Sequence, residues 1–129
     1  MDHGRWTIVN HNMAFKFESL QVWQKGLDLT NEVDQLAKKS FPKEELYVLT
    51  SQIKRAADSV VLNIAEGCTG QSNAVFKQFL NYSLRSAIEV VSCLFIGRKR
   101  NIINEADFKR LYDEYQSLTK MITALRNTL

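Results

Sequence analysis

Four stretches of the sequence repeat apolar residues every three or four positions, and three short breaks separate them. The stretches run over about 19–39, 42–66, 73–98 and 105–129. Apolar residues at this spacing line one face of an amphipathic helix. The chain of 129 residues has one proline and five glycines, too few turn residues for a β-sandwich. The pattern therefore predicts an all-α fold, an up-down antiparallel four-helix bundle with short connections.

Turn and capping residues mark the expected helix ends. Ser19, Ser72 and Asn104 suit the N-cap, where a side-chain oxygen accepts a hydrogen bond from an unpaired backbone N–H. Pro42 suits a first helical position, because the backbone N–H that it lacks would be unpaired there. Gly67 suits the left-handed residue just past a helix end. These residues place the connections near 39–42, 67–72 and 97–104.

The third and fourth helices differ in how their apolar residues are arranged. The fourth has a heptad seam with alternating spacings of three and four, made of Phe108, Leu111, Tyr115, Leu118, Ile122, Leu125 and Leu129. The third has a stripe of Phe76, Leu80, Leu84, Ala87, Val91 and Leu94, with Val75, Phe79, Tyr82, Val90 and Phe95 beyond it. A helix that is apolar on more than one side is buried on more than one side. In a chain this short, the second apolar side favours a homo-oligomer.

The basic excess is concentrated in one quarter of the chain. The formal net charge is +3, yet residues 68–100 alone carry +4. The five cations there are Lys77, Arg85, Arg98, Lys99 and Arg100, and the one acid is Glu89. A clustered basic excess is typical of a surface that binds polyanions. An ordinary solvated face is the alternative, and the sequence leaves it open.

Few residues are suited to catalysis or metal binding. Both histidines, His3 and His11, precede the helical region, which therefore lacks the commonest general base and metal ligand. The Glu-x-x-His pairs of diiron bundles do not occur in the sequence. Glu66 and Glu89 remain as candidates for a carboxylate-only metal site. We expect no enzyme, no cofactor and no bound metal.

The two cysteines are too few for a disulfide framework, and they form no C-x-x-C pair that would indicate structural zinc. Cys68 and Cys93 are therefore expected to be reduced thiols of a cytoplasmic protein. Cys93 lies in an apolar run and is expected in the core. Cys68 lies on a predicted loop, with no histidine available to activate it.

The N-terminal residues are polar, and we predict a disordered or weakly ordered extension over 1–14 before a single domain over 15–129. Residues 1–12 contain no apolar stretch of the length found in a signal peptide. The longest apolar run, 90–97, is too short to span a bilayer. We therefore expect no membrane partner.

Polar residues follow one face of the expected second helix. Arg55, Ser59, Asn63 and Glu66 are four, four and three positions apart, and Gln52 precedes them. Beside an apolar stripe, such a ladder forms an internal hydrogen-bond network or a subunit contact. It can equally form a ligand or partner site, and both interpretations stay open.

Several motifs resemble one known family. The second helix carries FPKEELYVLTSQIKRAADS over residues 41–59, followed by NIAEG over 63–67. With FESLQVWQK over 17–25 and FKQFL over 76–80, these motifs resemble the four-helix bundle proteins encoded in 23S rRNA intervening sequences. The resemblance covers about residues 15–125. It implies a four-helix bundle, often assembled as a ring-like homopentamer, and a relation to the accessory proteins of diversity-generating retroelements. Those accessory proteins are basic pentamers that bind nucleic acid and a reverse transcriptase.

Charge and resemblance together favour a non-enzymatic, homo-oligomeric bundle that binds RNA or DNA through phosphate contacts. The candidate contact residues are Lys54, Arg55, Lys77, Arg85, Arg98, Lys99 and Arg100. The alternative is a protein-interaction scaffold, for example an accessory subunit of a reverse transcriptase, that does not itself bind nucleic acid.

Overall fold

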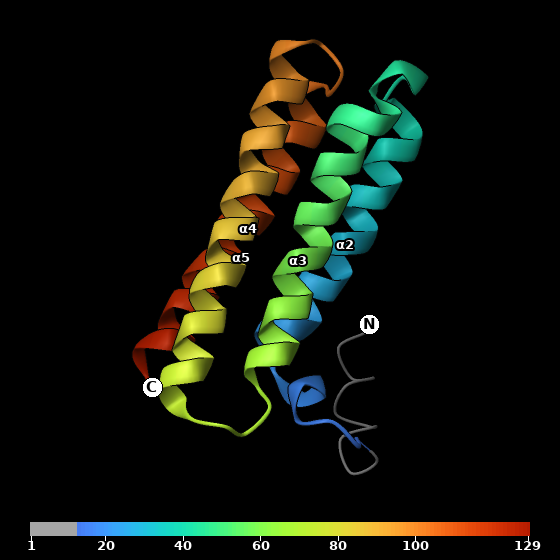
Figure 1. The fold of residues 1–129 in the computed structure, drawn as a ribbon. Coiled ribbons are helices and arrows are strands. Elements are labelled where there is room, and N and C mark those ends of the chain that lie inside the picture. The colour runs from blue at the N-terminus through green and yellow to red at the C-terminus, as the bar shows by residue number, and fades with distance from the viewer. Residues whose placement is uncertain (1–12) are drawn as a thin grey trace.

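The computed structural model describes residues 13–129 and shows four long helices packed side by side (Figure 1). The helices are α2 (Gln21–Ser40), α3 (Ser51–Gly67), α4 (Asn73–Lys99) and α5 (Glu105–Asn127). Short turns precede α2 and α3, namely η2 (Lys16–Ser19), η3 (Lys43–Glu45) and η4 (Leu46–Thr50). Successive long helices run in opposite directions, and the part of the chain that the structure describes contains no strand. The predicted all-α, up-down four-helix bundle is confirmed.

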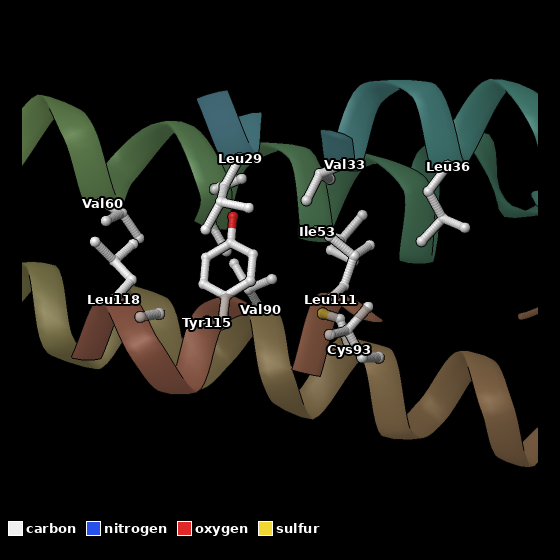
Figure 2. Packing of buried hydrophobic residues seen from close by; sticks show 14 of the residues in the cluster. Leu29, Val33, Leu36, Ile53, Val60, Val90, Cys93, Leu111, Tyr115 and Leu118 are labelled. Carbon is white, nitrogen blue, oxygen red and sulfur yellow. The ribbon is translucent and has the colours of Figure 1, made fainter. Parts of the chain in front are cut away.

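The core is a single apolar cluster to which all four long helices contribute. Figure 2 shows Tyr115 and Leu118 of α5 pointing toward Leu29 of α2 and Val60 of α3. The predicted heptad seam of α5 is buried from Phe108 to Ile122, and its last two leucines are partly buried. Burial of this seam supplies the main driving force for folding of a bundle.

Two of the predicted N-caps are confirmed. The Ser72 hydroxyl accepts a hydrogen bond from the Val75 backbone N–H at 3.1 Å, and the Asn104 side chain accepts one from the Asp107 N–H at 2.7 Å. The prediction for Ser19 is wrong, because its hydroxyl donates to the Lys16 carbonyl and α2 begins at Gln21 without a side-chain cap. Ser19 therefore belongs to the η2 turn rather than to the start of α2.

The prediction that Gly67 adopts a left-handed conformation is also wrong. Gly67 is the last residue of α3, and the positive φ values fall at Gly70 (87°) and Asn101 (59°). A Cβ atom at Gly67 would lie 2.5 Å from the Cβ of Phe79 on α4. Glycine is thus required here by the close approach of α3 to α4 rather than by the backbone angle.

The start of the second predicted helix is irregular. Regular α-helix begins at Ser51 rather than at Pro42, after the 3₁₀ turn η3 and the π-helical turn η4. A π turn closes i→i+5 hydrogen bonds and so shifts the side-chain register. Leu46 is therefore half exposed, whereas Leu49 and Thr50 are buried.

Among residues 13–129, α4 is the one helix that is long and apolar enough to cross a membrane by length and composition. Core helices of soluble bundles meet the same criterion, and α4 contributes Leu80, Ala87, Val90 and Leu94 to the core described above. The predicted extension over 1–14 lies almost entirely outside the described residues, because only Met13 and Ala14 of it are described.

Candidate nucleic-acid interface

The seven predicted phosphate-binding residues do not form one cluster. Lys77 lies in the second turn of α4, whereas Arg98 and Lys99 lie at its C-terminal end and Arg100 follows it. Twenty-one residues of helix separate Lys77 from Arg98, which corresponds to about 30 Å at 1.5 Å per residue. A surface that used all seven residues would extend along the whole bundle.

Two of the seven residues are tied to acids of other helices or turns. The Lys54 Nζ lies 2.9 Å from Oδ1 of Asp34 on α2, and the Arg100 guanidinium lies 3.7 Å from Glu45. The Lys54 and Lys38 ammonium groups both bond to Asp34, and they hold the pKa of that carboxyl below its ordinary value. Arg100 therefore has less charge to offer to a phosphate, whereas Lys54 shares its one acidic partner with Lys38 and keeps part of its charge.

Arg98 is held by both an acid and aromatic rings. Its guanidinium lies 3.3 Å from Glu105, 3.8 Å from the ring centroid of Phe108 and 5.2 Å from that of Phe95. Cation–π contact of this kind fixes a guanidinium in place. Arg98 therefore helps to join α4 to α5, a role that sequence spacing does not reveal.

The remaining four candidates are exposed and make no ion pair with any residue in the described part of the chain. They are Arg55 on α3 and Lys77, Arg85 and Lys99 on α4. Arg85 lies over the ring of Tyr82, 5.8 Å from its centroid, which leaves the charge accessible. Three of these four unpaired cations thus lie along one helix, whose one acid is Glu89.

The predicted polar ladder lies mainly at the seam between α3 and α4. The Asn63 side chain donates to the Ser59 carbonyl (2.8 Å) and hydroxyl (3.0 Å), and the Ser86 hydroxyl of α4 donates to the Ser59 hydroxyl (2.8 Å). Gln52 donates a longer bond to Glu89 at 3.4 Å. These bonds join α3 to α4 within one chain, and a role in subunit contact stays a prediction.

Other residues of the ladder do not join this network. Arg55 and Glu66 are exposed, and neither side chain makes a hydrogen bond or an ion pair within residues 13–129. Sequence reasoning missed two members of the seam, Ser86 and Ser83, of which Ser83 donates to the Val60 carbonyl at 2.7 Å. Their position three residues apart on a mostly apolar helix is the feature that would have indicated them.

Four large apolar side chains of η4, α3 and α4 are exposed, and one of them, Phe95, also packs its ring on Phe108 and Tyr112 of α5. We call Val48, Leu62, Ile88 and Phe95 the α3–α4 outer face, and Leu62 and Ile88 are each 64% exposed. Val48 lies in η4, directly before α3. Side chains of this size on a solvent-facing surface indicate a site of interaction when they occur together.

The thiols and carboxylates are not arranged for catalysis in the described residues. Cys68 and Cys93 are free and buried, and burial raises the pKa of both thiols, to about 11 for Cys93. Glu66 lies next to Gly67, which packs on Phe79, ten residues or about 15 Å along α4 from Glu89. No group of three metal-ligating side chains occurs within residues 13–129.

The fold and its exposed residues define a helical bundle that presents a surface of unpaired cations and apolar side chains. The sequence model of the 23S rRNA-intervening sequence protein family matches residues 18–124, and the chain belongs to this family. The predicted relation to the accessory proteins of retroelements stays a prediction.

A solved structure supports the fold independently. It is a protein of unknown function from the S23 ribosomal protein family of Bacteroides thetaiotaomicron, 24% identical to this chain, with a TM-score of 0.75. The match covers 81% of this chain and 97% of the other. At this identity the likeness shows the fold alone. None of the curated proteins matches the chain.

Proposed function

We propose that this protein is a non-enzymatic bundle that binds RNA or DNA through the unpaired cations of α4. The observation that carries the proposal is that Lys77, Arg85 and Lys99 are exposed on one helix without acidic partners, whereas most cations on α2 and α5 are ion-paired. An unpaired cation attracts a phosphate without first losing a salt bridge. Binding of this kind depends strongly on salt and reads little sequence.

A second copy of the chain is the occupant that we propose for the α3–α4 outer face. Leu62 on α3 is flanked by Asp58 and Glu66, whereas Ile88 on α4 has Arg85 one turn before it. The two exposed apolar positions therefore have charges of opposite sign beside them, which favours a head-to-tail contact between copies. Such contacts close into rings when the rotation permits.

The two proposals are compatible for Lys77 and Lys99, whereas Arg85, one turn from Ile88, would lie inside the contact between copies. Lys77 and Lys99 each lie eleven residues from Ile88, or about 16 Å along α4. A contact of standard size centred on Ile88 would place both lysines at its rim, where they remain open to solvent. Each added copy then contributes further cations to the assembly. If the protein is instead an interaction scaffold, a different protein would occupy the same face.

The test is fluorescence anisotropy with single-stranded RNA, structured RNA and duplex DNA, from about 50 to 300 mM salt. The variant Lys77→Gln/Arg85→Gln/Lys99→Gln should weaken binding at least about tenfold and lower the salt slope. The control Lys25→Gln/Lys109→Gln/Lys120→Gln removes the same charge from α2 and α5 and should change binding about twofold at most. Equal losses in both variants would show that net charge, rather than α4, governs binding.

A further variant separates paired from unpaired cations. Arg98→Gln/Arg100→Gln removes two cations that already have acidic partners. We expect a smaller loss of binding than for two unpaired cations, such as Lys77→Gln/Lys99→Gln. The reverse order would contradict the proposal.

A further inference from the structure

A pocket lies at the corner where α2 leads into α3. It has a volume of about 230 Å³ and is lined by Ala37, Lys38, Phe41, Pro42, Lys43, Leu46, Thr50 and Lys54. Much of this lining comes from the FPKEELYVLTSQIK segment on which the family resemblance was recognised. Neither the proposed phosphate contacts on α4 nor the proposed subunit contact uses this pocket.

The rim of the pocket carries an excess of positive charge. The Lys38 and Lys54 ammonium groups lie 3.0 Å and 2.9 Å from the two oxygens of one carboxylate, Asp34. Lys43 is exposed and makes no ion pair with any described residue. Three lysines therefore line the pocket, two of them share the one carboxylate of Asp34, and Glu44 follows Lys43 in η3. Between one and two positive charges are left uncompensated.

The wall of the pocket holds a polar group that the fold leaves unused. Thr50 lines the pocket and is 9% exposed, and its hydroxyl, which makes no hydrogen bond with the residues that the structure describes, stays in contact with solvent. This hydroxyl can therefore donate a hydrogen bond to a ligand in the pocket without breaking a bond within the described part of the chain. Thr50 also ends the π-helical turn η4, a type of turn that often occurs at functional sites.

Apolar side chains form much of the remaining lining. Phe41, Pro42 and Leu46 provide hydrophobic surface beside the lysines. The volume is below that of a pocket for a drug-sized ligand, so the occupant is a small group or one end of a larger molecule. A planar ring beside a doubly charged anion fits both the apolar wall and the charge of the rim.

We propose that this pocket binds a nucleotide through its phosphate monoester, either as a free nucleotide or as the 5′ end of an RNA strand. A phosphate monoester carries between one and two negative charges at neutral pH, which matches the uncompensated charge of the lysines. Lys43 and Lys54 contact the phosphate, Thr50 donates a hydrogen bond to it, and the base lies against Phe41 and Pro42. The inference rests on the proposed nucleic-acid function and gives it a second, end-specific site.

The first test is calorimetric titration of the full chain with AMP, adenosine and inorganic phosphate. AMP should bind at least about tenfold more tightly than either fragment, because it alone occupies both the charged rim and the apolar wall. Lys43→Gln/Lys54→Gln should weaken AMP binding about tenfold or more, and Thr50→Val about threefold. The control Lys109→Gln/Lys120→Gln on α5 removes the same charge and should leave AMP binding within about twofold.

Two results would contradict the proposal that this pocket binds a nucleotide. In one, AMP binds no better than adenosine or phosphate. In the other, the pocket variant and the α5 control lose AMP affinity equally. Thermal unfolding of each variant shows whether it is folded. If Lys43→Gln/Lys54→Gln destabilises α3, the Thr50→Val variant, which preserves the shape of the side chain, still tests the pocket.

An RNA arm distinguishes the two sources of the phosphate. With AMP binding established, a 5′-phosphorylated RNA of about eight nucleotides that binds more tightly than its 5′-hydroxyl form supports an RNA end as ligand. Equal binding of the two RNAs supports a free nucleotide. Loss of RNA binding in the α4 triple variant with AMP binding intact would separate this pocket from the proposed α4 surface, so that either can fail alone.

Discussion

The two sides of the bundle satisfy their polar groups in different ways. Three ion pairs cross from α2 to α5, namely Lys25–Glu114, Lys39–Asp107 and Glu32–Arg110. Between α3 and α4, no ion pair occurs in the described residues, and hydroxyl and amide hydrogen bonds join the helices instead. We call the first side the α2–α5 face.

The difference extends to the exposed apolar residues. Of the two helices, α2 exposes one large apolar side chain, Leu27, which is 38% exposed, and α5 exposes none among the described residues. The α3–α4 outer face exposes four. Ion pairs are stable in contact with water, whereas burying an exposed leucine or isoleucine against a partner stabilises the complex. The comparison indicates that the α2–α5 face is suited to solvent and the α3–α4 outer face to contact.

The close packing of α3 on α4 offers the largest expected effect. Gly67→Ala places a Cβ 2.5 Å from the Phe79 Cβ, an atom next to the backbone that cannot move aside, so α3 and α4 must separate. We expect a loss of about 3 kcal/mol in the free energy of unfolding, measured by denaturant titration.

Gly97→Ala is the matched control for that substitution. Its Cβ would meet the Cδ1 and Cγ1 atoms of Ile103, which can move by a change of side-chain rotamer. The gain in helix propensity from glycine to alanine is the same at both positions. We expect a loss at least about 1 kcal/mol smaller than for Gly67→Ala. Equal losses would contradict the view that the α3–α4 approach is the more constrained one.

The exposed apolar residues provide the second prediction. Leu62→Asp/Ile88→Asp puts charges where a neighbouring copy would pack, so we expect self-association to weaken about thirtyfold or more, measured by sedimentation. Leu27→Asp on α2 should change it about twofold at most. Because all three side chains are exposed in the monomer, the unfolding free energy should stay within about 0.5 kcal/mol. If self-association of the double variant is unchanged, the α3–α4 outer face is not the contact between copies.

The hydroxyl network at the α3–α4 seam provides the third prediction. Ser59→Ala removes the acceptor of bonds from Asn63 and Ser86, and we expect a loss of about 1 kcal/mol in unfolding free energy. Ser117→Ala on the exposed side of α5 should cost less than about 0.5 kcal/mol. A loss no greater at Ser59 than at Ser117 would mean that water replaces these bonds without cost.

Local patterns in the sequence predicted the parts of the fold that depend on local interactions. The α5 seam and the caps at Ser72 and Asn104 were predicted correctly, since a helix face and its first turn involve neighbours in sequence. The predictions for Ser19 and Gly67 were wrong, because η2 and the contact with Phe79 depend on the surrounding turns and helices.

The candidate site shows the same limit more clearly. Arg98 and Lys99 are adjacent and equally basic in the sequence, yet one is fixed by Glu105 and Phe108 and the other is unpaired among the described residues. A rotation of 100° per residue turns one side chain toward α5 and the other toward solvent. The pocket at the α2–α3 corner could not be predicted either, because its lysines come from three segments.

The ion pairs of the α2–α5 face provide the smallest expected effect. Arg110 and Glu32 are both about half exposed, so their attraction is screened by water and by salt. Arg110→Gln should lower the unfolding free energy by about 0.5 kcal/mol or less at low salt, and the difference should fall further as salt is added.

A double-mutant cycle with Glu32→Gln isolates the pair from the second contact of Arg110, with Asp107 at 3.8 Å. A coupling above about 2 kcal/mol would show that the pair is shielded from water. The α2–α5 face would then be a covered surface as well, and the contrast with the α3–α4 outer face would not hold.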